Sequence, residues 1–442
     1  MNKKEKYQIV KMLIILSIPT ILEQLLSTLL QYVDTAMVGR LGENATAAVS
    51  VTTTITWLMG SISSAFSVAV IAMISKAIGS GEKEKVTLIS QQVVAVVVGT
   101  GIVLGGISMA LSPYIPIWMG AEKAVRKDAS IYFFIISVPF IFRTSSTLFG
   151  AAVRATQNTK TPMLISTFAN ILNAILNVLL IYIVGLGVAG AAIASAVSYV
   201  VGGCMMFIAF RKNEHFNWKF NSFKLNKEIL TEGMRLSLPV IGTNFASCLG
   251  YVFFAGMVSG MGTTIFAAHS IAVTAETCFY IPGYGIRMAA SAMVGTAYGE
   301  KNKKKFDVIS SISIMFTLIL MVMTGIVLYH VAYPLMCIFT NSTKVAGLGA
   351  AMLKMVAFSE PFFGLMIISE GIMYGLGKTK YSFIVETGCM WGIRIAMTFV
   401  VVKIWHMGLT QVWYCMIADN MCKSLLLVLP VATEKRREKL FG

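Results

Sequence analysis

Charged residues are scarce in this sequence of 442 residues. Only 13% are Asp, Glu, Lys or Arg, well below the share of roughly a quarter that is typical of soluble domains. Hydrophobic residues make up 56%, and the mean hydropathy is +0.76. This composition excludes an ordinary soluble domain and favours a membrane protein.

The residues and motifs of common enzyme and metal sites are also missing. Histidine occurs four times, and the seven cysteines are scattered through apolar segments without a CxxC pair. No Ser/His/Asp arrangement and no phosphate-binding glycine loop can be identified. We therefore expect no enzyme and no cofactor.

Long apolar runs dominate what remains. A helix needs about 20 apolar residues to cross a bilayer, and about twelve segments approach or exceed that length. The predicted spans are 11–37, 49–78, 87–112, 128–153, 161–184, 188–210, 234–259, 264–297, 306–332, 346–374, 380–404 and 409–431. The sequence thus predicts an all-α polytopic membrane protein.

The net charge of +16 resides mainly in the connections between these spans. Most cations fall on one side of an even-span topology, including those of the N-terminus, of the long connection after residue 210 and of the C-terminal tail. Because positive connections stay in the cytoplasm, we expect both termini there and the chain in the cytoplasmic (inner) membrane. Because membrane topology explains the cations, we do not expect nucleic acid as a partner, although a basic chain would otherwise indicate it.

The chain repeats itself at an offset of about 220 residues. Leu16-Ser17-Ile18-Pro19 recurs as Leu236-Ser237-Leu238-Pro239, and Thr159-Lys160 recurs as Thr379-Lys380. Six spans per repeat predict two six-helix lobes related by a pseudo-twofold axis along the membrane normal. The expected domains are an N-lobe (1–210), a cytoplasmic linker (211–230) and a C-lobe (231–442).

Polar residues gather on helix faces in the first half. Glu23 and Asp34 share a face of the first span, with Ser27 and Gln31 on or near that face. Further polar groups are spaced as stripes in the fifth and sixth spans, namely Asn170, Asn173, Asn177, Ser195 and Ser198. One carboxylate with amide and hydroxyl oxygens suits a proton or sodium, and Asp34, Asn173 and Asn177 would be the metal ligands if the ion is sodium. The alternative is that the asparagines only hold helices together.

The second half carries a different set, because Phe254 stands at the repeat position of Asp34. Acids and aromatic residues suit an organic cation, whereas the alternative is buried Glu–Arg pairs that fix helix packing. We interpret Asp419 and Lys423 as a structural pair, and His269 and Trp391 as packing residues. The eighth span places Glu276, Tyr280, Tyr284 and Arg287 on one face, which we expect Ile281-Pro282-Gly283 to interrupt, and the tenth and eleventh add Glu360, Glu370, Glu386 and Arg394.

Several of these motifs together resemble the multidrug and toxic compound extrusion (MATE) family over nearly the whole chain. The first half contributes Pro19, Val33-Asp34-Thr35-Ala36-Met37-Val38-Gly39, Asn173-Ala174-Ile175-Leu176-Asn177 and Gly190-Ala191-Ala192-Ile193-Ala194-Ser195. The second contributes Ala267-Ala268-His269, Met293-Val294-Gly295 and Trp391-Gly392-Ile393-Arg394.

The resemblance implies two lobes around a central cleft, alternating access, and export of cationic compounds driven by inward protons or sodium. It assigns the first-lobe ion site of one branch to Asp34, Asn173, Asn177 and Ser195, where this chain has Asn177 in place of Asp and Ser195 in place of Thr. Another branch has a Glu in the seventh span, where this chain has Ser247.

The resulting hypothesis is a monomeric secondary transporter that binds small organic cations and membrane lipid and takes H+ or Na+ as coupling ion. We predict that Asp34, Asn170, Asn173, Asn177 and Ser195 couple the ion. The predicted substrate-binding residues are Glu23, Gln31, Glu276, Tyr280, Tyr284, Arg287, Glu360 and Glu370. The alternatives are a lipid-linked oligosaccharide flippase of the same superfamily and, from another class, a membrane-embedded enzyme or receptor.

Overall fold

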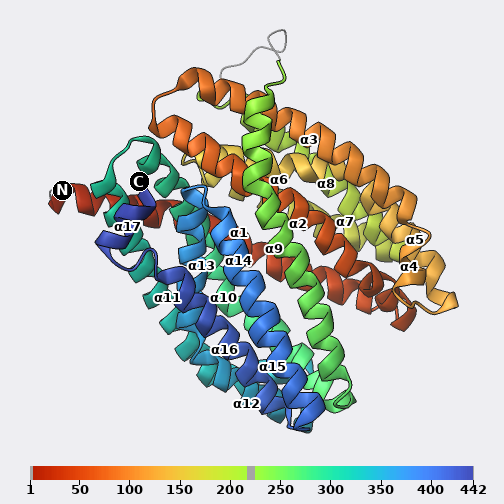
Figure 1. The fold of residues 1–442 in the computed structure, drawn as a ribbon. Helices are drawn as coiled ribbons and strands as arrows, with labels where there is room; N and C mark the ends of the chain where they lie inside the picture. The colour runs from red at the N-terminus through yellow and green to blue at the C-terminus, as the bar shows by residue number, and fades with distance from the viewer. Residues whose placement is uncertain (1–2, 217–223, 442) are drawn as a thin grey trace. The chain divides into compact units, whose positions relative to one another are not determined.

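The computed structural model describes residues 3–216 and 224–441, and every regular element within these ranges is a helix (Figure 1). In the described chain, nine helices are long and apolar enough to cross a membrane, and two bent pairs of shorter helices each provide one further span. The 20-residue α16 (Leu409–Val428) covers the last predicted span. The structure thus confirms an all-α protein with about twelve spans.

The helices of the first half follow the predicted spans. They are α1 (Lys3–Gly39), α2 (Glu43–Gly79), α3 (Lys83–Leu111), the short α4 (Ile115–Trp118), α5 (Lys123–Ser137), α6 (Phe140–Ala155), α7 (Lys160–Asn177), the π-helical η1 (Val178–Ile183) and α8 (Gly187–Arg211).

The spans of the second half follow in the same order. They are α9 (Lys227–Ser259), α10 (Thr263–Gly299), α11 (Lys303–Phe339), α12 (Thr343–Ala357), α13 (Glu360–Gly375), α14 (Thr379–Cys389), η3 (Met390–Ile395), α15 (Ala396–Phe399), η4 (Val400–Ile404), α16 and α17 (Glu434–Phe441).

The structure reproduces the sequence repeat at the starts of four helices in each half. Helices α2, α3, α5 and α6 begin at 43, 83, 123 and 140, and α10, α11, α12 and α13 begin at 263, 303, 343 and 360, which is 220 later in each case. The turns match too, since Gly42 and Gly262 have φ angles of 110° and 115°, a conformation that glycine adopts without strain. The repeat is therefore structural and not a coincidence of composition.

The chain forms two compact units. The N-unit comprises Leu22–Leu238, and the C-unit comprises Met1–Ile21 together with Pro239–Gly442. These units differ from the sequence halves in one respect. The first segment of α1 belongs to the C-unit, and the first segment of α9 belongs to the N-unit. The change of unit falls close to Pro19 in α1 and at Pro239 in α9.

The structure bends two of the predicted spans, and the expected interruption of a third at Pro282 proves wrong. The predicted spans 128–153 and 346–374 are bent by 49° between α5 and α6 and by 57° between α12 and α13. Pro139 and Pro361 lie at these bends and lack the N–H that a continuous helix needs. Conversely, α10 runs unbroken through Pro282, where we expect an interruption. Buried helices tolerate a proline when neighbouring groups satisfy the freed backbone.

The predicted linker 211–230 overlaps the start of α9, and its residues 217–223 lie outside the described residues. Gln92 of α3 holds the segment that follows them. Its side chain donates to the carbonyl of Lys224 at 2.8 Å and accepts from the backbone N–H of Asn226 at 3.0 Å. The start of α9 is thus fixed to the N-unit by side-chain hydrogen bonds.

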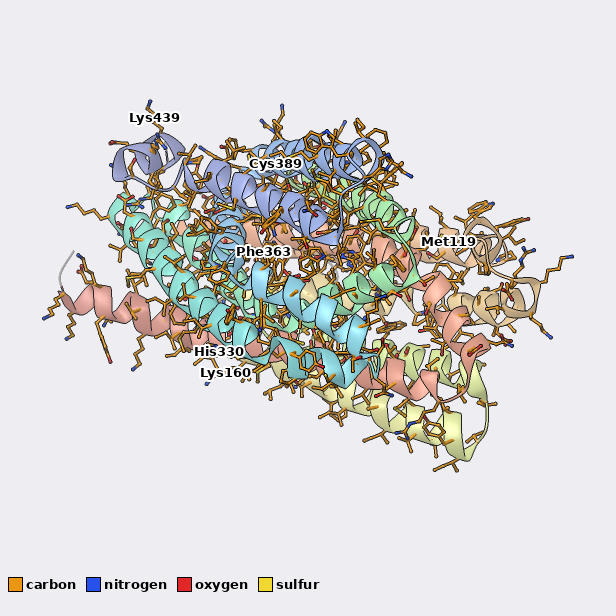
Figure 2. The ribbon with its side chains drawn as sticks, turned by 90° about the horizontal axis from the view of Figure 1, so that it is seen from below. Met119, Lys160, His330, Phe363, Cys389 and Lys439 are labelled. Atoms are coloured by element: carbon orange, nitrogen blue, oxygen red, sulfur yellow. The ribbon has the colours of Figure 1, made fainter. Side chains whose placement is uncertain are left out.

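The C-terminal α17 packs within the C-unit. Arg437 forms an ion pair with Asp307 of α11 at 2.8 Å, and the ring of Phe441 lies 5.2 Å from that of Phe306. Lys439 on the same helix is exposed and points outward (Figure 2).

Candidate functional site

Helices α1 and α7 are joined by polar side chains at a constant spacing along both helices. Ser166 donates to Glu23 at 2.7 Å, Asn170 donates to Ser27 at 3.0 Å, and Asn177 donates to Asp34, with 143 residues between the partners in each case. A constant separation requires the helices to run parallel in one register. The asparagine stripe of α7 and the polar face of α1 therefore meet as predicted.

Four of the predicted ion-coupling residues form one connected group, which we call the Asp34 cluster: Asp34, Asn173, Asn177 and Ser195. Beyond its bond to Asp34, Asn177 donates to Asn173 at 3.2 Å, and Asn173 donates to Ser195 of α8 at 3.2 Å. The fifth predicted residue, Asn170, bonds Ser27 one turn away. Three helices of the N-unit thus supply the cluster.

The cluster has oxygen atoms available to an ion. Asn177 is fully buried, and its Oδ1 has no hydrogen-bond partner within the described parts of the chain, although buried polar atoms are normally paired. Asp34 is only half-buried and is therefore accessible. One carboxylate with amide and hydroxyl oxygens fits a proton or a hard cation such as sodium. The π-helical η1 begins directly after Asn177, and π-bulges occur frequently at functional sites.

Glu23 lies in a different environment from Asp34. Its carboxylate forms an ion pair with Arg154 of α6 at 2.6 Å, and both side chains are buried. Gln31, in contrast, is exposed. Glu23 thus belongs to a buried ion pair, an arrangement that also holds helices in place.

The C-unit contains a second buried ion pair of this kind. Arg287 of α10 pairs with Glu370 of α13, which also accepts a hydrogen bond from Tyr374. The guanidinium lies 4.6 Å from the ring centre of Tyr284. Three of the predicted substrate-binding residues (Tyr284, Arg287 and Glu370) therefore form one group.

Two other predicted acids of the C-unit are buried and have no hydrogen-bonded partner among the described residues. Glu360 is 1% exposed, and neither carboxylate oxygen is hydrogen-bonded. Glu276 is also buried and interacts electrostatically with Glu360 and Arg394. The ring of Tyr280 lies beside them, 4.9 Å from that of Phe363 and 6.1 Å from that of Tyr284. Buried acids next to aromatic faces are an environment for an organic cation.

Three further charged residues of the C-unit, Arg394, Asp419 and Lys423, form a network of buried ion pairs. Asp419 is fully buried and accepts from Arg394 and from Lys423, each at 2.8 Å. This confirms the structural pair of Asp419 and Lys423 and adds Arg394 to it. His269 packs against Trp413 with ring centres 5.8 Å apart, and Trp391 donates to the carbonyl of Ala246, so both are packing residues as expected.

Sequence reasoning missed two arginines of α6. Arg154 pairs with Glu23, and Arg143 interacts with no acidic side chain among residues 3–216 and 224–441. Both stand in or next to the predicted span 128–153, and a cation at such a position is itself a signal that a partner or a ligand is needed.

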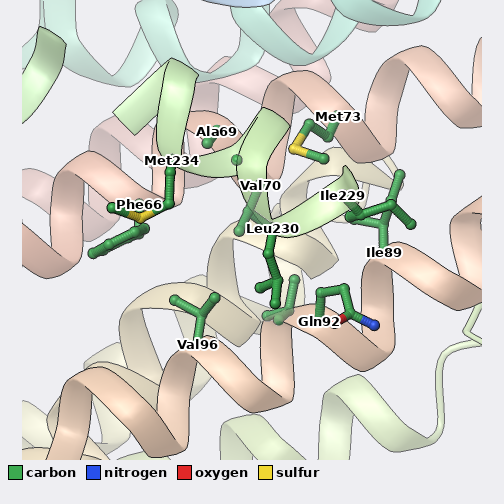
Figure 3. Close-up of a pocket in the computed structure, with 12 residues that line it drawn as sticks. Phe66, Ala69, Val70, Met73, Ile89, Gln92, Val96, Ile229, Leu230 and Met234 are labelled. Carbon is green, nitrogen blue, oxygen red and sulfur yellow. The ribbon is translucent and has the colours of Figure 1, made fainter. Parts of the chain in front are cut away.

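An apolar pocket in the N-unit is not part of the candidate site. It lies between α2, α3 and the first turns of α9, with Phe66, Met73, Ile229 and Met234 among its lining residues (Figure 3). Its volume is about 60 Å³, and no charged side chain lines it. Such a small apolar space offers nothing that would bind an ion or a drug-sized cation.

Two repeated bundles of membrane-crossing helices with buried carboxylates define the class of this protein as a multi-pass membrane transporter. The profile of the MatE family matches residues 19–179 and 239–400, one segment in each half. The chain belongs to the MatE family and is a MATE transporter.

Individual relatives are similar to this chain over nearly its whole length. A probable multidrug resistance protein NorM of Thermotoga maritima is 27% identical over 439 residues, which cover 97% of this chain and 93% of that protein. The NorM protein of Streptococcus pneumoniae strain R6 is 26% identical, with 92% of this chain and 91% of that protein covered. The MATE transporter VcmN of Vibrio cholerae has the same fold, with a TM-score of 0.92 at 20% identity over 99% of this chain and 100% of that chain.

Proposed function

We propose that this transporter exports organic cations in exchange for inward H+ or Na+ by alternating access, from the cytoplasmic membrane and with both termini in the cytoplasm. The observation that carries the proposal is the Asp34 cluster, in which a half-buried carboxylate and an unpartnered buried amide oxygen meet within a membrane-spanning bundle. The names of the relatives, probable multidrug resistance proteins, support the export of drugs.

The ion at Asp34 acts as the switch of the cycle. A ligand shifts a conformational equilibrium only if it binds one state better than the other. Hydrogen bonds link Asp34 of α1 to Asn177 of α7, and Asn173 links α7 to Ser195 of α8. An ion bound at the cluster therefore favours whichever conformation keeps these three helices in register.

Organic cations bind near Glu276 and Glu360, two acids of the C-unit that form no close ion pair within the described chain and lie beside aromatic rings. The negative charges of Glu370 and Glu23 are already balanced by arginine partners. We therefore assign these two acids a smaller role in cation binding.

Glu276→Gln and Glu360→Gln are each expected to raise the substrate concentration needed for half-maximal transport. A charged contact in a desolvated site contributes roughly 1.5–3 kcal/mol, which corresponds to a tenfold or larger change. Initial rates of ethidium transport in vesicles provide the measurement, and Glu84→Gln, which alters an exposed acid of α3, is the matched control. Unchanged concentration dependence in both variants would assign these acids a structural role.

The experiment that tests the proposed function is transport of an organic cation by purified protein in vesicles, with proton and sodium gradients imposed separately. We expect one of the two gradients to drive accumulation of the cation against its own gradient. Accumulation under neither gradient, with movement of a lipid-linked sugar instead, would support the flippase.

The topology can be tested independently by cysteine labelling. Cysteine at position 212, directly after α8, should react in intact cells only with a membrane-permeant maleimide, because the basic residues there favour the cytoplasm. Cysteine at position 122, an exposed position between α4 and α5, should react with the impermeant reagent, and the unmodified chain with its native cysteines is the control. Labelling of position 212 from outside would reverse the topology.

A further inference from the structure

Lys354 is a cation on the exposed side of a membrane-spanning segment of the C-unit. It lies in α12, about 16 Å along the helix from its first residue, Thr343. Its side chain is exposed, and no acidic side chain that the structure describes comes within ion-pair distance. A charge within a span is costly and is a functional-site hypothesis by default.

The neighbouring helix α11 presents an apolar surface on the same unit. Met323, Ile326 and Val327 are each more than half exposed there. Exposed apolar side chains over successive turns of a membrane-crossing helix mark a face that contacts lipid. Lys354 therefore stands at the edge of a lipid-facing surface, away from the water that normally surrounds an exposed lysine.

Three rings accompany this lysine. Nζ of Lys354 lies 5.6 Å from the ring centre of Tyr329, and the rings of His330 and Phe358 lie 5.5 Å and 5.6 Å from that of Tyr329. His330, which Figure 2 labels, is exposed, and so is Phe358. A ring face attracts the ammonium without neutralising its charge. We call these four residues the Lys354 cluster.

The internal repeat shows that packing does not require a polar group at this place. The residues 220 positions earlier, in α3 and in and after α5, are all apolar: Met109, Ala110, Phe134 and Val138. Phe134, the counterpart of Lys354, is 46% exposed, as a lipid-facing residue would be. The fold thus accepts a wholly apolar face here, and the Lys354 cluster is particular to the C-unit.

The cluster offers a cation beside a hydrogen-bond acceptor. Nδ1 of His330 donates to the carbonyl of Ile326 at 2.8 Å, so Nε2 of the neutral ring is left as the acceptor. The ammonium of Lys354 supplies a point charge with three donors, which suits a phosphate group. A ligand that carries both a phosphate and a hydroxyl group matches this pair.

The direction of the lysine side chain points to the source of that ligand. Side chains lean toward the N-terminus of their helix, so Lys354 leans toward the start of α12, where the chain leaves the span. Lysines within a span reach the headgroup layer in this way. Basic groups between membrane helices bind lipid headgroups.

We infer that the Lys354 cluster binds phosphatidylglycerol, with the lipid phosphate at Lys354 and a glycerol hydroxyl that donates to Nε2 of His330. The inference adds a lipid-binding site to the C-unit and goes beyond the proposed function. Testing it needs neither a transported substrate nor an ion gradient, so the two can fail separately.

The test is a titration of purified protein in detergent micelles, with the lipid-bound fraction measured by native mass spectrometry. Phosphatidylglycerol is compared with phosphatidylethanol, which has the same charge but no free hydroxyl, and with phosphatidylcholine, which has no net charge. We expect the wild type to bind phosphatidylglycerol most tightly. Lys354→Gln should weaken this binding about five- to tenfold, because one cation near the headgroups is lost.

Two substitutions taken from the repeat sharpen the result. Lys354→Phe and His330→Ala introduce the residues that the N-unit carries at these positions, so both variants should fold like the wild type. Lys354→Phe should remove the preference for anionic lipid, and His330→Ala should bind phosphatidylglycerol no better than phosphatidylethanol. Lys344→Gln, at an exposed lysine in the first turn of α12, is the matched control and should bind like the wild type.

Several outcomes would overturn the inference. They are equal binding of phosphatidylglycerol and phosphatidylcholine by the wild type, unchanged binding in Lys354→Gln, and an equal loss in Lys344→Gln. Equal binding of phosphatidylglycerol and phosphatidylethanol by the wild type overturns the contact with His330. Dimers of the chain in place of lipid adducts would assign this face to a second copy and overturn the inference as well.

Discussion

Asp34→Asn is expected to reduce gradient-driven export to the level of protein-free vesicles while leaving the fold intact. Asparagine has the same shape and keeps an oxygen that accepts the hydrogen bond from Asn177. It can neither release a proton nor supply the negative charge that neutralises sodium. The measurement is accumulation of an organic cation in vesicles under an imposed gradient.

Two further variants make this result specific. Asp128→Asn, at an exposed carboxylate of α5, should transport like the wild type. Asn177→Ala removes the amide that bonds Asp34 but no charge, so it should weaken coupling without abolishing it. Wild-type export by Asp34→Asn would exclude Asp34 from the mechanism and leave the acids of the C-unit as the remaining candidates.

Asp419→Ala is expected to cause the largest loss of stability. The substitution leaves the buried side chains of Arg394 and Lys423 without their shared acid. Breaking a buried ion pair by removing one partner typically costs about 3–5 kcal/mol, because the other charge stays uncompensated. The measurement is the free energy of unfolding of the purified protein in mixed micelles, and failure to accumulate in the membrane is the extreme form of the same result.

A surface ion pair of the same unit provides the control. Glu438 on α17 pairs with Lys303 at 3.0 Å, and its side chain is 64% exposed. Glu438→Ala should cost less than about 1 kcal/mol, because solvent screens exposed charges. Equal losses in the two variants would mean that Asp419 does not depend on its buried partners.

Much of the fold could be predicted from the sequence because the membrane limits the choices. Backbone groups in lipid must be paired within helices, so apolar runs translate directly into spans. The repeat at 220 residues then predicted that both halves contain the same helices in the same order. The bends at Pro139 and Pro361 were harder to predict, since Pro282 leaves α10 unbroken. Whether a proline bends a helix depends on the residues that pack around it in the fold, and the sequence does not identify these residues.

The candidate site was predictable only in part. Helical spacing placed Asp34 on one polar face and Asn173 and Asn177 on another, and the structure brings these faces together. The register between α1 and α7 is a tertiary property, so spacing alone could not show which residues pair.

Ion pairs between different helices could not be predicted from the sequence for the same reason. The chain separates Glu23 from Arg154 by 131 residues, so only the fold reveals their ion pair. Arg143 was overlooked because one charge in an apolar span carries little weight until its surroundings are known.

The most direct test of the account is ion movement driven by the substrate itself. Vesicles containing wild-type protein are loaded with tetraphenylphosphonium and diluted into medium without it, while proton uptake is followed with a trapped pH dye and sodium uptake with a radioactive tracer. We expect efflux of the cation to draw one of the two ions inward, and we expect Asp34→Asn to remove this uptake. Efflux without uptake of either ion in the wild type, or undiminished uptake in Asp34→Asn, would contradict it.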